Sequence, residues 1–430
     1  MRAGRRILYA LPRRALLRYV RTPRGRADAS DGVVILLSSA WGMGGTIRSA
    51  LNLAGWLAQH RHVEIITPYR RRDDPFFGAF PSGVVVTALA DERAGHAPRG
   101  LSGVAYRRLH RLPSVLFPKV DRLRKDHSLW TDIMLVRLLR RRTGILIGTR
   151  PGFNIMLAMM RPPGFTTVGM EQMHLDNHRA RLRRAIEHWY PRLDALVALT
   201  EQDVEEYDDL LRGQLKLEAI PNTVRLLGGP EIDPSRNVAV AAGRLGRLGQ
   251  KGFDLLLLAW AKVAERHPDW RLRIHGEGPL RPQLEAMVRD LGLIDLVELP
   301  GAADDMGEAL SEGSVFVLSS RYEGFPLILL EAMSKGLACV GFDCPTGPSE
   351  IIADHANGLL VPPEDVEALA RSIVELIEDA ELRRRLGDAA ATTALEYTME
   401  SIGPHWDRFF DELHPTRKPP RERPMATILV

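Results

Sequence analysis

The order of short apolar runs and helix-length segments constrains this chain most, because a β–α alternation occurs in two separate series. The first series starts near residue 31 with VVILLSS and continues through VEIIT, VVVTAL, ILIGTR, TTVGME and ALVALT. The second starts with VAVAAGRL and continues through RLRIHGEGP, VELPG, SVFVLSS, LACVGF and GLLVPP. Such alternation is typical of a parallel sheet with helices on both faces. The sequence therefore predicts an α/β chain with two doubly wound domains.

A polar linker divides the two series. The segment TVRLLGGPEIDPSRN, which follows IPN, contains Pro and Gly, so the domain boundary is expected near residues 222–236. The final Pro- and Arg-rich stretch is expected to be loose. The predicted segments, in chain order, are a basic N-terminal tail (1–30), an N-terminal Rossmann-like domain (31–222), a C-terminal Rossmann-like domain (223–395), a C-terminal helix that packs back on the N-terminal domain (396–415) and a loose tail (416–430).

The composition is that of an ordered globular chain. Hydrophobic residues make up 45% and charged residues 26% of the 430 residues, which are ordinary values for a globular protein. No apolar run approaches the ~18 residues that a spanning helix needs, and Pro12, Arg13 and Arg14 interrupt the first apolar stretch. We therefore expect the protein in the cytoplasm. Cys339 and Cys344 have no His or Cys at metal-ligand spacing, so we interpret them as packing thiols.

Two basic segments of the N-terminal half mix cations with apolar side chains. Residues 1–26 contain nine arginines and no acidic residue, and residues 106–125 combine arginines and lysines with leucines and aromatics. Either a contact with an anionic membrane surface or a solvated arginine-rich surface fits the first segment. For the second, no motif of a nucleic-acid-binding module is present, so nucleic acid is not an expected partner. An anionic lipid or a polyanionic acceptor fits it better.

Two glutamates flank an apolar helix in the second series. RYEGFPLILLEAMSKG places Glu323 on the turn after a predicted strand and Glu331 on the following helix. Pro326 suits the first helical position and Gly336 suits the position just past the end. Turns at the carboxyl ends of parallel strands are where such folds bind ligands, and the N–H groups that open a helix there favour an anion. Both carboxylates are therefore candidate site residues.

Glycine-rich turns occur at three other strand-to-helix junctions. AAGRLGRLGQKGFD places Arg244 and Lys251 beside closely spaced glycines, which suits a phosphate group. It is not a Walker A loop, because Gly252 rather than Ser or Thr follows the lysine. IHGEGP offers a turn against which a flat ring could rest, and SSAWGMGGTIRSA connects the first strand to the first helix. The candidate glycines of these last two turns are Gly44, Gly45, Gly276 and Gly278.

Six motifs, in this order and at these spacings, resemble those of the retaining glycosyltransferases of family 4: GMGGT, IPN, GRLGRLGQKGFD, HGEGP, RYEGFPLILLEAM and TGPSEII. The resemblance extends from about residue 31 to Leu413. Its most specific motif is the Glu-x7-Glu pair that Glu323 and Glu331 reproduce. The resemblance implies the GT-B architecture, in which an N-terminal acceptor domain and a C-terminal nucleotide-sugar domain face each other across a cleft.

The resemblance also implies roles for the candidate residues. Arg244 and Lys251 would bind the donor diphosphate and stabilise its charge as it departs. Glu323 would contact hydroxyls of the transferred sugar, and Glu331 would accept hydrogen bonds from both ribose hydroxyls. Because the chain has no Asp-x-Asp triplet, no metal ion is expected. The further substrate-binding residues are Gly44, Gly45, Gly276, Gly278, Gly324, Phe325 and Leu327.

The acceptor side rests on the segment VGMEQMHLDNHRARLRR. Members of the family often carry a histidine in this loop that shapes the sugar site. His174 is favoured for that role and is included among the candidate catalytic residues; alternatively, Gln172 occupies that position and His174 is structural. In the mechanism implied by the resemblance, the leaving phosphate takes the acceptor proton, so no general base is required. No cofactor is expected.

The interpretation that follows is a retaining hexosyltransferase. The expected donor is a UDP-sugar, and the expected acceptor is a lipid-linked saccharide or an anionic cell-envelope polymer at the inner face of the plasma membrane. Two alternatives stay open: a GT-B-shaped nucleotide-sugar epimerase or phosphorylase, and a non-catalytic polymer-binding homologue. A phosphorylase usually needs a pyridoxal lysine, which is not identifiable here. The intact cations and carboxylates argue against the non-catalytic alternative.

Overall fold

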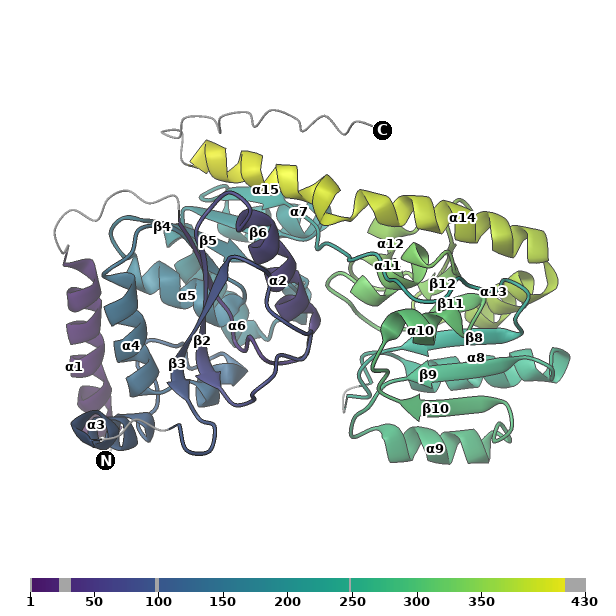
Figure 1. Cartoon of the computed structure of the whole chain (residues 1–430), viewed down its shortest axis with the longest axis horizontal. Coiled ribbons are helices and arrows are strands. Elements are labelled where there is room, and N and C mark those ends of the chain that lie inside the picture. Colours follow the sequence, from purple (N-terminus) through teal and green to yellow (C-terminus); the bar gives the residue numbers. More distant parts are fainter. Residues whose placement is uncertain (1, 23–31, 97–99, 247–248, 414–430) are drawn as a thin grey trace, which may run out of the picture.

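The structure is a computed structural model that describes residues 2–22, 32–96, 100–246 and 249–413. Two α/β domains lie side by side, and each has one parallel sheet with helices on both faces (Figure 1). This arrangement confirms the fold class predicted from the alternation. The loose tail predicted over residues 416–430 lies outside the described residues.

The N-terminal sheet has seven parallel strands in the order β3-β2-β1-β4-β5-β6-β7. All four residues of the first strand, VVIL, are buried, because helices cover both faces of the sheet. The strands are β1 (Val33–Leu36), β2 (Val63–Arg70), β3 (Val84–Asp91), β4 (Gly144–Gly148), β5 (Phe165–Met170), β6 (Ala195–Ala198) and β7 (Lys216–Ala219). The helices are α1 (Arg2–Arg21), α2 (Gly45–Leu57), α3 (Gly100–His110), η1 (Arg122–Asp126), α4 (Leu129–Leu139), α5 (Pro151–Met160), η2 (Leu175–Asn177), α6 (Ala180–Trp189), η3 (Tyr190–Arg192) and α7 (Glu201–Leu211).

The C-terminal sheet has six parallel strands in the order β10-β9-β8-β11-β12-β13. Apolar residues of its two faces form separate core clusters against the flanking helices. The strands are β8 (Val238–Ala242), β9 (Arg271–His275), β10 (Val297–Gly301), β11 (Val315–Leu318), β12 (Ala338–Phe342) and β13 (Leu359–Val361). The helices are α8 (Phe253–Arg266), α9 (Arg281–Asp290), α10 (Met306–Ser311), α11 (Leu327–Ser334), α12 (Pro348–Ile351), α13 (Val366–Glu378), α14 (Ala380–Glu396) and α15 (Met399–Leu413).

Helix α15 returns the chain to the N-terminal domain, where it packs on α2 (Figure 1). The Trp56 indole N–H donates a hydrogen bond to Asp407 Oδ2 at 3.0 Å. Gly403 permits this close approach, because a Cβ there would lie 2.2 Å from the Trp56 ring. The apolar face of α15 completes one side of the N-terminal core with Ile402, Trp406, Phe409 and Phe410.

The N-terminal basic segment contains a helix that is docked on the domain. Helix α1 packs on α4 and α5, and Val20 joins their core with 2% of its surface exposed. The Arg21 guanidinium donates hydrogen bonds to the carbonyls of Met159 at 2.6 Å and Met160 at 3.1 Å. These carbonyls end α5, where a helix lacks internal donors and favours a cation. No helix within the described ranges is both long enough and apolar enough to cross a membrane.

Candidate active site

Glu323 and Glu331 lie on the elements that the sequence predicts for them. Glu323 is on the turn between β11 and α11, and Glu331 is on α11. Pro326 directly precedes the helix, and Gly336 follows its end with φ +77°. Glu323 is 6% exposed and Glu331 is 5% exposed. Since buried carboxylates are costly without partners, each must be matched by a cation or by hydrogen-bond donors.

Glu323 is held by Lys251 and Ser320. The Lys251 Nζ lies 2.7 Å from Glu323 Oε1, and the Ser320 hydroxyl donates to the same oxygen at 2.5 Å. The backbone N–H of Glu323 donates to the Pro345 carbonyl at 3.1 Å. The turns after β8, β11 and β12 therefore meet at Glu323.

A glycine makes the approach of two of these turns possible. Gly252 adopts φ +59° at the start of α8, and a Cβ there would lie 1.9 Å from the Ser319 carbonyl oxygen. The aliphatic part of the Lys251 side chain lies along Gly243, 3.1 Å from where a Cβ would be. The glycines of AAGRLGRLGQKGFD thus bring the lysine to Glu323.

Glu331 is paired with a residue of the other domain. Arg48 Nη1, from the first turn of α2, lies 2.5 Å from Glu331 Oε1. Burial raises the pKa of Glu331, and the Arg48 charge and hydrogen bond oppose that rise. Sequence reasoning did not identify Arg48. The available signal was a cation three residues after Gly45, on the first turn of the helix that follows the glycine-rich loop.

Further contacts close the domains on each other. Gly324 lies so close to the loop after β5 that a Cβ would be 2.3 Å from the Gln172 carbonyl oxygen. The Gln172 side chain accepts a hydrogen bond from Asn222 Nδ2 at 3.0 Å. Arg244 Nη2 donates to the Met43 carbonyl at 3.4 Å, beside the predicted glycine-rich loop. The candidate site therefore lies between the domains, with contributions from both.

The remaining predicted glycines have different surroundings. Gly44 precedes α2, and a Cβ on Gly45 would lie 3.8 Å from Leu327 Cδ1. Gly276 and Gly278 face backbone: Cβ atoms there would lie 1.9 Å from the Gly243 oxygen and 2.2 Å from the Leu245 oxygen. Close packing of neighbouring turns thus explains why both positions are glycine. A pocket of about 270 Å³ lies nearby, and its lining includes Arg244, Leu245, Lys251, Leu280, Gln283 and Arg321.

Phe325 and Leu327 complete the turn that carries Glu323. Phe325 is 8% exposed, and its ring lies 5.6 Å from the Tyr397 ring, centroid to centroid. The backbone N–H of Leu327 donates to the Phe325 carbonyl at 2.9 Å. These contacts fix the backbone that opens α11, the position at which a helix favours an anion.

His174 belongs to a polar cluster of the N-terminal domain. Its Nδ1 lies 2.9 Å from Asp203 Oδ1 and 3.4 Å from Glu206 Oε2, both on α7. The side chain is buried, and within the described residues no hydrogen bond or ion pair joins it to the C-terminal domain. The structure thus places His174 beside α7, whereas Gln172 of the same loop reaches Gly324.

Buried polar groups anchor the start of that loop. Glu171 Oε1 accepts a hydrogen bond from Asn154 Nδ2 at 2.9 Å and another from the Tyr190 hydroxyl. Burial and the Glu171 charge raise the pKa of Tyr190 well above its ordinary value. The Tyr190 hydroxyl therefore keeps its proton and donates the hydrogen bond to Glu171. This bond holds Glu171, the residue that precedes Gln172, in place.

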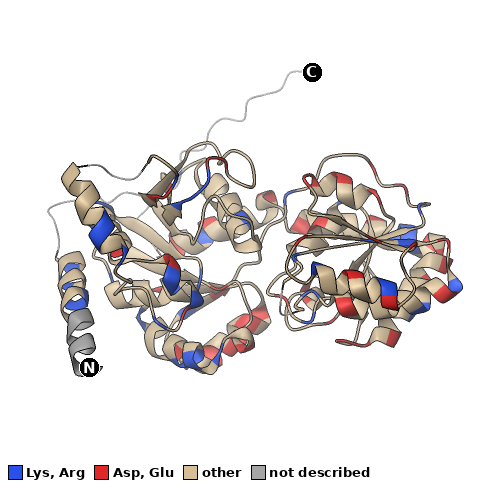
Figure 2. Ribbon diagram, turned by 90° about the horizontal axis from the view of Figure 1, so that it is seen from below, with Lys and Arg blue, Asp and Glu red and all other residues tan. Residues whose placement is uncertain are grey.

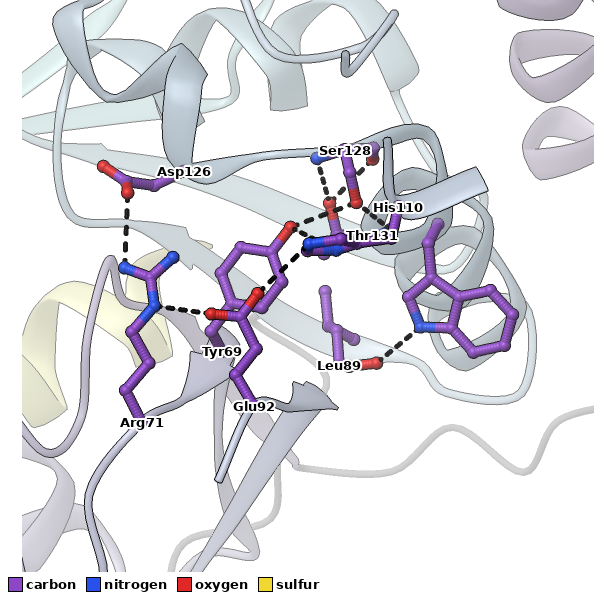
Figure 3. A network of polar contacts seen from close by, with 9 residues as sticks. Tyr69, Arg71, Leu89, Glu92, His110, Asp126, Ser128 and Thr131 are labelled. Carbon is purple, nitrogen blue, oxygen red and sulfur yellow. Dashed lines mark hydrogen bonds and ion pairs between the residues drawn. The ribbon is translucent and has the colours of Figure 1, made fainter. Parts of the chain in front are cut away.

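A second network braces the outer strands of the N-terminal sheet (Figure 3). Arg71 Nε lies 2.7 Å from Glu92 Oε2, and its Nη1 lies 3.3 Å from Asp126 Oδ1. The Tyr69 hydroxyl donates to Ser128 Oγ at 3.1 Å, and Ser128 caps α4. These bonds tie the carboxyl ends of β2 and β3 to the segment between α3 and α4.

Cations and carboxylates alternate over much of the molecule, whereas α1 carries cations without acids (Figure 2). Across the described part of the chain, no group of three or more His, Cys, Asp or Glu side chains is arranged to hold a metal ion. Cys339 and Cys344 are both buried, and burial raises the pKa of the Cys344 thiol to about 12.

Comparison with known proteins finds similarity over the C-terminal domain and, with one relative, over most of the chain. Residues 228–393 match the family model described as glycosyl transferases group 1, and this range contains Glu323, Glu331 and Lys251. An exopolysaccharide phosphotransferase of Streptomyces coelicolor is 35% identical over 396 residues, which are 89% of this chain and 41% of that relative. A poly(ribitol-phosphate) alpha-N-acetylglucosaminyltransferase of Staphylococcus aureus is 27% identical over 223 residues, 51% of this chain and 44% of the relative. The chain thus spans less than half the length of either relative.

A solved structure shows the same fold over both domains. A variant of S. aureus TarM, in complex with fondaparinux, alpha-GlcNAc-glycerol and UDP, matches with a TM-score of 0.70 at 15% identity. The match covers 89% of this chain and 100% of the TarM chain. The two facing parallel-sheet domains are therefore those of the GT-B fold, as the sequence predicts.

Proposed function

We propose that this chain is a retaining glycosyltransferase that moves a hexose from a nucleotide sugar to an anionic cell-envelope polymer or a lipid-linked saccharide. The observation that carries the proposal is the pair of buried carboxylates between the domains, each matched with a cation. Glu323 is paired with Lys251, and Glu331 is paired with Arg48. The match of the C-terminal domain to glycosyl transferases group 1 supports a transferase.

The nucleotide sugar would bind mainly to the C-terminal domain. Glu331 would accept hydrogen bonds from the ribose hydroxyls, and Glu323 would accept them from the sugar. Charge-assisted hydrogen bonds in such a buried setting are short and strong. Lys251 and Arg244 would contact the diphosphate. UDP is the proposed nucleotide, because it is bound in the TarM complex.

The proposed reaction breaks the bond between the anomeric carbon and the diphosphate oxygen. Negative charge then collects on the leaving phosphate, where Lys251, Arg244 and the amides of Gly44 and Gly45 would stabilise it. One preorganised donor of this kind is worth about 3 kcal/mol of barrier. The acceptor hydroxyl attacks the anomeric carbon from the same face, the leaving phosphate takes its proton, and the configuration is retained.

The acceptor proposal rests on the basic surface of the N-terminal domain. On α3 and the residues after it, Leu101 is 91%, Val104 41% and Leu112 48% exposed. Helical spacing places Leu101, Val104 and Arg108 on one face of α3, with Arg107 beside it, and Arg111 and Leu112 directly follow the helix. Such a face suits an anionic lipid surface or a phosphate-rich polymer. The names of the two relatives, which include an exopolysaccharide and poly(ribitol-phosphate), favour the same class of acceptor.

Donor screening followed by product analysis tests the proposal. A bound nucleotide raises the melting temperature by mass action, so we expect UDP-sugars to stabilise the protein in a thermal-shift assay. With a poly(ribitol-phosphate) or lipid-linked acceptor, NMR of the product should show the anomeric configuration of the donor. Inverted product, or release of an epimerised sugar without any acceptor, would contradict the proposal.

A further inference from the structure

The two Glu331 oxygens differ in their contacts with the described residues. Oε1 accepts a hydrogen bond from Arg48, whereas Oε2 has no hydrogen-bond partner among those residues. The residue is buried, yet Oε2 is not among the buried unpaired polar atoms of the described residues, so solvent reaches it. Oε2 is therefore an unpaired acceptor on the carboxylate that would bind the nucleotide.

Arg48 is itself held in place. Its guanidinium lies over the Phe77 ring, 5.4 Å from the centroid. On the same helix, Ser49 is hydrogen-bonded to Asn222, and Asn52 Nδ2 donates to the Thr223 carbonyl at 3.2 Å. The first turns of α2 are thus fixed to the linker between the domains, and Arg48 is presented to Glu331 from a rigid position.

A buried carboxylate without its cation takes up a proton more readily. Among the charged groups of the described residues, only Arg48 opposes the effect of burial on the pKa of Glu331. A protonated carboxyl group has lost acceptor capacity, whereas two vicinal ribose hydroxyls need two acceptors. Removing Arg48 should therefore impair recognition of the ribose through the loss of charge on Glu331.

We propose that Arg48 is a positioning residue of the nucleotide site, which holds Glu331 as a carboxylate and leaves Oε2 free to accept hydrogen bonds from the ribose hydroxyls. The inference rests on the proposed function, because it assumes that Glu331 binds the ribose. It adds that the N-terminal domain completes the nucleotide site. Donor affinity then depends on the domains being closed, since Arg48 reaches Glu331 only across the interdomain space.

Calorimetric titration with UDP tests the inference in four proteins: wild type, Arg48→Gln, Glu331→Gln and the double variant. We expect Arg48→Gln to weaken UDP binding about tenfold or more near neutral pH, which is the loss expected for a hydrogen bond to a charged group. In the double variant the two effects should not add, because Arg48 acts through Glu331. The affinity of Arg48→Gln should recover as the pH is raised, because a larger fraction of Glu331 is then ionised without its partner.

Two further measurements separate positioning from a general structural effect. Wild type should prefer UDP over 2′-deoxy-UDP, and both single variants should lose that preference. Arg142→Gln is the matched control, since Arg142 also pairs with a buried glutamate, Glu64, at 2.5 Å. Glu64 lies at the amino end of β2, away from the candidate site, so this variant should lose stability but keep its UDP affinity. Arg48→Lys, which retains the charge, should bind more tightly than Arg48→Gln.

The outcomes are distinguishable. If Arg48→Gln binds UDP as tightly as wild type, Arg48 has no effect on binding and the inference is overturned. If the variant binds UDP more tightly, Arg48 competes with the nucleotide for Glu331, which also overturns the inference. Fully additive losses would also overturn it. If folded wild type binds none of UDP, GDP and ADP, the proposed function fails instead. Circular dichroism of each variant confirms that the fold is intact.

Discussion

Lys251 and Glu323 form an ion pair of 2.7 Å between the turns that follow β8 and β11. Neither residue is near the other in sequence, and each lies on a turn that the glycine or helix-start pattern had marked. In the proposed site, the pair places the cation that would bind the phosphate beside the carboxylate that would bind the sugar. The two therefore require separate tests, one of donor affinity and one of turnover.

Lys251→Ala should weaken donor binding. The lysine would supply a charge-assisted hydrogen bond to the diphosphate, so its loss should reduce affinity by about tenfold or more. Calorimetry with UDP and with UMP measures this effect, since UMP lacks the second phosphate and should be less affected. An equal change in the affinities for UDP and UMP would contradict the assignment of Lys251 to the diphosphate.

Glu323→Gln should lower kcat more than it lowers donor affinity. The amide keeps the size of the side chain but loses the charge that would bind the reacting sugar, so the loss should be greatest in the transition state. Steady-state kinetics and UDP-sugar calorimetry measure the two quantities separately. Turnover of the variant at the wild-type rate would contradict the role of Glu323.

Gly252→Ala should strongly destabilise the site. The added Cβ would meet the Ser319 oxygen at 1.9 Å, at a residue with φ +59°. We expect a loss of about 3 kcal/mol or more in the free energy of unfolding. Gly213→Ala is the matched control, because Gly213 has φ +64° and open space around it, so only the cost of about 1 kcal/mol for the left-handed conformation applies. Chemical denaturation measures the free energy of unfolding of both variants. Equal losses would contradict the prediction, because the turn at Gly252 could then move away from Ser319 at no extra cost.

Stability should fall as the pH decreases below about 6.5. Burial and the Arg150 charge lower the pKa of His127 to about 3, and its ring stacks on Phe117 with centroids 3.8 Å apart. Below the unfolded pKa only the unfolded chain takes up this proton, so the contribution is present above about 6.5 and is lost at up to ~1.4 kcal/mol per pH unit. Denaturant titrations of His127→Gln from pH 7 to pH 5 should show a smaller slope than wild type. His62→Gln, at an exposed position, should keep the wild-type slope.

Anionic vesicles should retain the protein through the α3 surface. Each basic residue near such a surface contributes about 1 kcal/mol, and the exposed Leu101 and Val104 add apolar contact. Leu101→Ser/Val104→Ser should reduce co-sedimentation with phosphatidylglycerol vesicles, and salt should reduce it for wild type. Leu395→Ser changes a leucine that is 51% exposed on α14 of the other domain and should have no effect. Equal binding of all variants to anionic and neutral vesicles would exclude this surface as the contact.

The sequence predicted the fold and placed Glu323 and Lys251 on their turns. It did not predict which side chains of the two domains contact each other. The alternation of β-branched runs and helices determines the sheets, because each run must be buried on both faces. Arg48 was not predicted as a site residue, because its partner Glu331 lies 283 positions away in the other domain. The docking of α1 was also not foreseen, because its leucines and Val20 have the same spacing whether they face a lipid surface or α4 and α5.

The surroundings of His174 depend on local bonds that the sequence does not reveal. The family resemblance favoured this residue, because members often carry a histidine in this loop. In the structure its Nδ1 lies 2.9 Å from Asp203 Oδ1, and its role at the sugar site stays a prediction. The capping side chain of Thr200 begins α7 there and accepts the backbone N–H of Asp203. Which residue of a loop faces the cleft depends on such local bonds, and these cannot be read from spacing alone.

The return of α15 has a consequence for how the protein is synthesised. Trp406, Phe409 and Phe410 belong to the N-terminal core, so the C-terminal domain is, topologically, an insertion within its neighbour. On the ribosome, the first domain cannot cover this face of its sheet until residue 413 has emerged, long after its own strands have been translated. The second domain, encoded in one continuous stretch, can fold first. An isolated N-terminal domain should accordingly retain residues 399–413 together with residues 32–222. Without α15, the apolar surface that it covers would be exposed and would favour aggregation.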